Sequence, residues 1–146
     1  MNLTRESEYA LRGLARLAAY PPGSMVSLAE IAEAEELPSA FLAKIFQKLA
    51  RHGVLQAERG RGSGYALRDL PEDTRVCDVL EAVEGPRALK RCLLWGGHCS
   101  EATPCPLHNR LKHLHTSLDE ILSQLTLADF ANDNPGASPP WNAGVK

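Results

Sequence analysis

The sequence contains no apolar run of about 18 residues, the length needed to cross a membrane as a helix. Its first twenty residues are interrupted by Arg12 and Arg16, and no small-residue cleavage motif follows them. We therefore expect no secretory signal, no membrane partner and a cytoplasmic protein. Aromatic residues make up only 5% of the chain, but 44% hydrophobic and 23% charged residues are an ordinary globular balance. The 146 residues suffice for one compact domain with an appendage.

Cysteine is also scarce, yet three of the four cysteines, Cys92, Cys99 and Cys105, lie close together in the chain. Structural disulfides are uncommon in a reducing cytoplasm, so this grouping indicates metal ligands or reactive thiols. Structural zinc sites usually use C-x₂₋₄-C pairs, which are absent, and three widely spaced thiolates suit an iron–sulfur cluster better. Cys77 falls within an apolar helical pattern, where we expect a small buried residue. Because no cysteine–histidine pair accompanies a recognisable substrate pocket, we expect no enzyme.

The net charge of −2 excludes a uniformly basic nucleic-acid binder, but the charge is unevenly distributed. Residues 38–68 contain six cationic side chains and only Glu58 as an acid, a local balance of +5. Residues 69–146 contain seven basic and eleven acidic side chains, a balance of −4. Phosphate binding depends on the local field, so a basic surface is expected in the first half of the chain.

The first half of the chain predicts three helices followed by a β-hairpin. We expect helices over about 4–19 and 27–37, the second opened by the capping box of Ser27 and Glu30. A third helix should run from Pro38 or Ser39 to Gly53, with one apolar and one cationic face. The glycine-rich RGRGSG segment then predicts a tight reversal between two short strands. The fold class is thus mainly α with a small β-hairpin wing, a winged helix-turn-helix.

This order of elements predicts a DNA-binding surface on the third helix and the hairpin tip. The side chains expected to read bases are Ser39, Ala40, Phe41 and Lys44. Those expected on phosphates or in a minor groove are Lys48, Arg51, Arg59 and Arg61. The alternative, in which the lysines and arginines only solvate a surface helix, does not account for the arginines at the hairpin tip.

The second half of the chain predicts a long helix with a coiled-coil period. Its apolar residues step by 4, 3, 4, 3 and 4 positions: Leu107, Leu111, Leu114, Leu118, Ile121 and Leu125. A mean spacing of 3.5 residues is typical of a seam between helices, so we expect a homodimer that binds a pseudo-palindromic DNA operator. The stripe could instead pack on its own domain.

Four regions follow from these patterns. They are the winged helix-turn-helix domain (1–70), a connecting helix and cysteine-rich loop (71–106), a dimerisation helix (107–130) and a disordered tail (131–146) that contains an unexplained Trp141.

The segments RESEYALRGLARLA, SLAEIAEAEELPSAFLAKIFQKLARHGVL and ERGRGSGYAL, with the cysteine loop, resemble the Rrf-type bacterial transcriptional regulators over roughly residues 1–130. The resemblance implies a homodimeric transcription factor, usually a repressor, whose DNA binding depends on an iron–sulfur cluster. It places the three thiolate ligands at Cys92, Cys99 and Cys105. It also implies a signal of iron or cluster status, nitric oxide or redox stress.

Two branches of this family suggest different fourth ligands. A histidine three residues after the last cysteine ligates a 2Fe–2S cluster in one branch, and His108 matches it. A first-helix aspartate from the partner subunit completes a 4Fe–4S cluster in the other, where this chain has Glu8. We favour His108 and 2Fe–2S, because imidazole replaces thiolate in known clusters. The first two cysteines are separated by six residues, where these branches commonly have five, so the loop geometry and the cluster type stay open. The chief alternative is a thiol-based redox or metabolite-responsive regulator on the same scaffold, whose cysteines oxidise instead of binding iron.

Overall fold

The computed structural model describes residues 3–86, 88–95 and 98–132 of the chain. Its elements are α1 (Arg5–Ala18), α2 (Leu28–Ala34), α3 (Ser39–Arg51), β1 (Leu55–Glu58), β2 (Gly64–Leu67), α4 (Val76–Glu84), η1 (Ala88–Lys90), α5 (His108–Gln124) and α6 (Leu127–Asn132). Among these elements, no helix has the length and apolarity needed to span a membrane. The expected tail, from residue 133 onward and including Trp141, lies outside the described residues.

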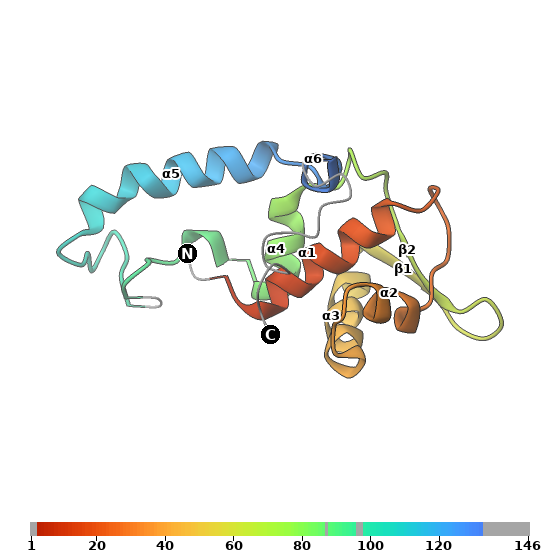
Figure 1. Cartoon of the computed structure of the whole chain (residues 1–146). Helices are drawn as coiled ribbons and strands as arrows, with labels where there is room; N and C mark the ends of the chain where they lie inside the picture. The colour runs from red at the N-terminus through yellow and green to blue at the C-terminus, as the bar shows by residue number, and fades with distance from the viewer. Residues whose placement is uncertain (1–2, 87, 96–97, 133–146) are drawn as a thin grey trace.

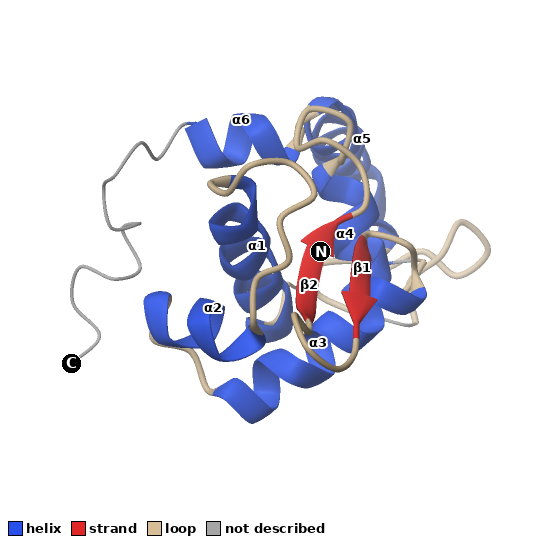
Figure 2. Ribbon diagram, turned by 90° about the vertical axis from the view of Figure 1, so that its right-hand side faces the viewer, coloured by secondary structure: helices blue, strands red, loops and turns tan. Residues whose placement is uncertain are grey.

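Helices α1, α2 and α3 pack together beside the β1–β2 hairpin, and α5 projects away from this body (Figures 1 and 2). The apolar faces of the three helices meet in one core, where Leu14, Ile31 and Phe46 have no exposed surface. Burying each such side chain contributes roughly 1.5–3 kcal/mol. Gly13 permits the close crossing of α1 over α3, since a Cβ there would lie 2.8 Å from the Phe46 ring. The predicted mainly helical fold with a two-stranded wing is confirmed.

The hairpin is antiparallel, with Leu55 opposite Leu67 and Glu58 opposite Gly64. It is held to the helical body by Tyr65, whose backbone exchanges two hydrogen bonds with Val26 at 2.9 and 3.0 Å. The backbone of Gly64 passes so close to the Val26 carbonyl that no Cβ fits between them. The wing is therefore attached to the loop before α2 and has a defined position relative to α3.

The turn between α2 and α3 contains Glu36 with φ at +53°, in the left-handed region. The Leu37 N–H donates to the Ala32 carbonyl at 2.8 Å, so the helix ends in a Schellman arrangement with Glu36 in the position that favours glycine. A side chain with a Cβ is strained in this conformation. The turn that sets the direction of α3 thus contains a residue poorly suited to its backbone.

The substitution Glu36→Gly is expected to raise the free energy of unfolding by about 1 kcal/mol, because glycine adopts this backbone without strain. Urea denaturation of the two proteins measures the difference. The matched control is Glu33→Gly, one turn earlier within α2, which should instead lose about 1 kcal/mol through helix propensity. Equal losses in both variants would contradict the assignment of strain to Glu36.

Helix α4 connects the winged-helix body to the C-terminal part. Its Val79 and Val83 join the main core, while Val76 and Leu80 form a second buried cluster with Leu89 of η1. Leu122, Leu125 and Phe130 pack against that second cluster. The C-terminal end of α5 is therefore anchored on α4.

The helix predicted over 107–130 is two helices in the structure. Helix α5 ends at Gln124, Leu125 is extended, and α6 returns the chain to α1, where Leu127 is fully buried in the main core. Thr126 caps α6, because its hydroxyl accepts from the Asp129 N–H at 3.2 Å while Asp129 Oδ2 accepts from the Thr126 N–H at 2.9 Å. This reciprocal pattern, a threonine followed three residues later by an acid, was readable in the sequence.

Candidate metal centre and nucleic-acid interface

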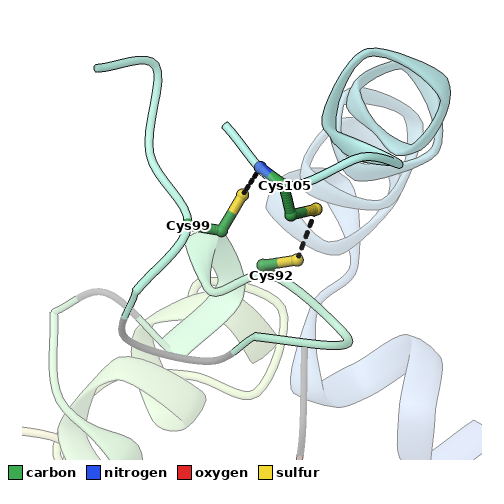
Figure 3. A group of neighbouring side chains, drawn as sticks. All are labelled: Cys92, Cys99 and Cys105. Carbon is green, nitrogen blue, oxygen red and sulfur yellow. Dashed lines mark hydrogen bonds between the residues drawn. The ribbon is translucent and has the colours of Figure 1, made fainter. Parts of the chain in front are cut away.

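The three clustered cysteines lie on the segment that joins η1 to α5, outside the winged-helix body (Figure 1). Their sulfur atoms are all within 4.8 Å of one another, and the Cys92 and Cys105 Sγ atoms are 3.9 Å apart (Figure 3). A disulfide would require about 2.05 Å, so these are free thiols. The structure brings together the three residues that the sequence selected.

Cys92 is a buried residue at the start of a tight turn. Backbone N–H groups of Trp95 and Leu94 donate hydrogen bonds to its sulfur and lower the pKa of the Cys92 thiol. N–H donors on sulfur stabilise the thiolate form, which is the form that binds metals. The turn is therefore arranged for a negatively charged sulfur at this position.

Cys99 has a different environment. The N–H of Cys105 donates to its sulfur at 3.4 Å and by itself lowers the pKa of the Cys99 thiol. Burial and the neighbouring thiols of Cys105 and Cys92 outweigh that bond, so the pKa of Cys99 is raised overall. Three thiols this close therefore resist simultaneous ionisation unless a cation joins them.

His108, the first residue of α5, adjoins this group at Cys99. Its Nδ1 lies 3.2 Å from the Cys99 Sγ, although its ring nitrogens do not lie within 4.8 Å of all three sulfurs. Its Nε2 is buried, has no hydrogen bond among the described residues, and lies 3.6 Å from Glu101 Oε1. Glu101 also accepts from Lys112 at 2.7 Å, which ties the loop to α5. His108 therefore contacts one of the three sulfurs directly.

Glu8 lies on α1, where its carboxylate accepts from Arg12 at 3.4 Å within the same chain. Arg12 is almost fully buried and also pairs with Glu35 at the end of α2. The single chain therefore gives Glu8 a partner on its own helix. The fourth cysteine, Cys77, is half-buried in α4, outside the group of three, and burial raises the pKa of its thiol.

A cleft of about 570 Å³ separates the cysteine loop from α5. Cys92, Cys99 and His108 line it, and so does His115, two turns further along α5. His115 was not among the residues that the sequence analysis selected. Its Nε2 is buried and has no hydrogen bond among the described residues. His115 follows His108 by seven residues, about two helical turns, and this spacing could have predicted that both lie on the same face of the helix.

The outer face of α3 carries Ala40, Lys44, Gln47 and Arg51, opposite the buried residues. Ser39 begins the helix and is exposed. Phe41 and Lys48 lie at the edge of α3 that faces α1. The Phe41 ring meets that of Tyr9 edge-on at 5.7 Å, and Lys48 Nζ lies 2.5 Å from Glu6 Oε2.

Arg59 and Arg61 are exposed in the turn between β1 and β2, which extends from the body beside α3 (Figure 2). A second cleft, also about 570 Å³, lies between α3 and the hairpin and is lined by Gln47, Arg51 and Arg59. Four of the predicted DNA-contacting cations, Lys44, Arg51, Arg59 and Arg61, are thus exposed on adjoining elements. Their contacts with DNA stay a prediction.

The predicted seam of α5 has no buried residue in the chain by itself. Leu114 is 47% exposed and Ile121 is 56% exposed, whereas Leu111 and Leu118 are half-buried. Leu107 precedes the helix, and Leu125 follows it and packs in the second cluster. Five of the six seam positions thus remain available for a partner, and Leu125 does not.

A winged-helix body, a converging group of thiols and a projecting helix define a helix-turn-helix transcriptional regulator. The family model of Rrf2, described as an iron-dependent transcriptional regulator, matches residues 3–133, so the chain belongs to the Rrf2 family of DNA-binding regulators. The predicted family resemblance is confirmed.

The relatives agree with this assignment. The regulator IscR of Vibrio atlanticus is 29% identical over 134 residues, which cover 92% of this chain and 77% of that protein. The solved structure of CymR, the global cysteine regulator of B. subtilis, superposes with a TM-score of 0.72 at 22% identity, over 90% of this chain and 97% of that one. The solved structure of T. potens IscR superposes with a TM-score of 0.71 at 24% identity, over 94% of this chain and 91% of that one. The two structural matches establish the fold.

Proposed function

We propose that this regulator binds an iron–sulfur cluster on the loop that joins η1 to α5 and that the cluster controls its occupancy of an operator, most simply as a repressor. The observation that carries the proposal is the convergence of three free thiols within 4.8 Å, between the winged-helix body and α5. The description of the family as iron-dependent supports the same reading. The signal would be iron or cluster status, nitric oxide or redox stress.

The donor set fits such a group. Cys92, Cys99 and Cys105 would supply thiolates, and the N–H groups on the Cys92 sulfur would stabilise its charged form. His108, next to Cys99, is the preferred fourth ligand and favours a 2Fe–2S cluster. Glu8 from a partner subunit is the alternative, with 4Fe–4S. When bound, the cluster would supply reversible redox and ligand-exchange chemistry.

The chain's own residues would connect the loop to DNA binding. Glu101 and Lys112 attach the loop to α5, and α5 is anchored on α4 through Leu122. If α5 pairs with a second copy, the position of the loop influences how the two winged-helix bodies are spaced. Half-site spacing on an operator is sensitive to such a change, because each α3 must enter its own major groove.

Glu6 is expected to limit the affinity of the DNA contact. Its carboxylate lies 2.5 Å from Lys48 Nζ and competes with a DNA phosphate for that cation. The substitution Glu6→Gln should therefore raise operator affinity a few-fold and steepen the salt dependence by about one unit of slope. Fluorescence anisotropy at several salt concentrations measures both quantities.

The matched control is Glu72→Gln, which removes one carboxylate from an exposed site after the hairpin. It should leave the salt slope unchanged. Weaker binding by Glu6→Gln would indicate that the ion pair positions α3, and the competition would then be refuted.

The proposed function is tested by anaerobic purification and reconstitution with iron and sulfide, followed by selection of genomic DNA fragments. A coloured protein with stoichiometric iron and sulfide, whose operator occupancy changes when the cluster is removed, supports it. A colourless protein whose DNA binding responds only to thiol oxidation would favour the cluster-free regulator instead.

A further inference from the structure

We propose that, without a cluster, the same three cysteines bind a single Zn²⁺ ion in a mononuclear thiolate site. Loss of a cluster would then lead to a zinc-loaded regulator and not to a chain with three metal-free thiols. Zn²⁺ binding does not itself require that a cluster forms. Only the competition between Zn²⁺ and the iron–sulfur cluster rests on the proposed function.

The sulfur separations suit one tetrahedral ion. With Zn–S bonds of about 2.3 Å, two thiolates on a tetrahedral zinc lie ~3.8 Å apart. The Cys92 and Cys105 sulfurs are 3.9 Å apart, and no pair in the group exceeds 4.8 Å. A cluster inserts several metal atoms between its ligands and needs wider spacing. The loop in its present conformation is therefore closer to a mononuclear site than the spacing of the cysteines in the sequence suggests.

A fourth donor with its own support lies beside the sulfurs. His108 Nδ1 is 3.2 Å from the Cys99 Sγ, so a small side-chain rotation would bring it to an ion held by the thiolates. Its other nitrogen, Nε2, would then face Glu101 Oε1, now 3.6 Å away. Carboxylate–histidine–zinc relays of this type orient the ring and increase its basicity.

The charge around the loop also suits this ion. Three thiolates and one Zn²⁺ leave a net charge of −1. The adjoining cleft is lined by the cations Lys90, Arg91 and Lys112 and by the acids Glu101 and Asp119, and Lys112 is paired with Glu101, so the lining keeps one more cation than acid. The backbone N–H groups of Leu94 and Trp95 already donate to the Cys92 sulfur. Excess negative charge at the site is thus partly compensated, which favours a thiolate-rich ion over protonated thiols.

The test uses the full-length, cluster-free protein, titrated anaerobically with Zn²⁺ and, as a spectroscopic probe, with Co²⁺. The proposal expects one ion per chain and the absorption of tetrahedral, thiolate-bound Co²⁺, which Zn²⁺ abolishes on addition. The variants Cys92→Ser, Cys99→Ser and Cys105→Ser should each weaken Zn²⁺ binding at least about 100-fold, since removal of outer-shell partners alone costs 10- to 100-fold. His108→Ala should shift the Co²⁺ spectrum.

The matched control is Cys77→Ser, because Cys77 is the one cysteine outside the group of three. It should bind both ions as the wild type does. No binding by the wild type, or binding that survives all three serine substitutions in the loop, overturns the proposal. A protein that assembles a cluster but takes up no Zn²⁺ refutes this inference alone, whereas Zn²⁺ uptake without any cluster assembly refutes the proposed function alone.

Discussion

Replacement of Cys92 by serine is expected to abolish the visible absorbance of the reconstituted protein and the cluster-dependent change in operator affinity. Cys92 is the buried member of the group of three, and its sulfur accepts hydrogen bonds from the backbone N–H groups of Leu94 and Trp95. A serine hydroxyl is not ionised at neutral pH and is a poor ligand for iron. Iron and sulfide content, visible circular dichroism and operator titrations measure the loss.

The same experiment on Cys77→Ser is the control, because it distinguishes the loss of a cluster ligand from the loss of any one cysteine. Cys77 lies half-buried in α4, outside the group, so its substitution should leave the absorbance and operator affinity as in the wild type. Secondary structure and unfolding midpoint should change little in both variants, because Cys92 is not part of the main core and Cys77 is only partly buried at the edge of the second cluster. A coloured, fully responsive Cys92→Ser protein would exclude Cys92 as a ligand.

The double substitution Leu114→Lys and Ile121→Lys is expected to convert the predicted homodimer into a folded monomer and to lower operator affinity by at least about 100-fold. These two side chains are the most exposed apolar residues of α5, so the change costs the isolated chain little. In a paired α5 seam, four lysines would be buried or brought together. Linked half-sites contribute about 10²–10⁴ in affinity, and this gain is lost with the dimer. Sedimentation velocity and anisotropy measure the two effects.

The control His113→Lys adds the same charge at an exposed position of α5 that is not part of the seam. It should remain dimeric and bind the operator normally. A doubly substituted protein that still sediments as a dimer would show that copies of the chain pair through another surface. A wild-type monomer at micromolar concentration would exclude the predicted homodimer altogether.

Patterns that are local in the chain were sufficient to predict most of the winged-helix body. The capping box of Ser27 and Glu30 was expected from its spacing, and the Ser27 hydroxyl accepts from the Glu30 N–H. Gly53 was expected to end the third helix, and it does so in a left-handed conformation, with φ at +76°. These features depend on residues within four positions of one another, where backbone sterics and hydrogen bonding decide the outcome.

The C-terminal part was predicted less well, because two competing signals overlap there. The heptad stripe favoured a single helix through Leu125, but Leu127 is an apolar residue with a better site in the main core. The Thr126–Asp129 capping pair permits the break that brings it there. A periodic pattern indicates which face is apolar, but it does not indicate against what that face packs.

The sequence by itself determined the three helices and the wing of the winged-helix body, the basic character of α3 and the choice of three cysteines, because each follows from residue type and short spacing. Only the tertiary structure decided which of these residues meet. It placed Phe41 against Tyr9 and Lys48 against Glu6, brought His108 to Cys99, and returned Leu127 to the core. These contacts join elements that are independent in the chain, and their geometry is fixed by the packing of apolar faces, which no local pattern contains.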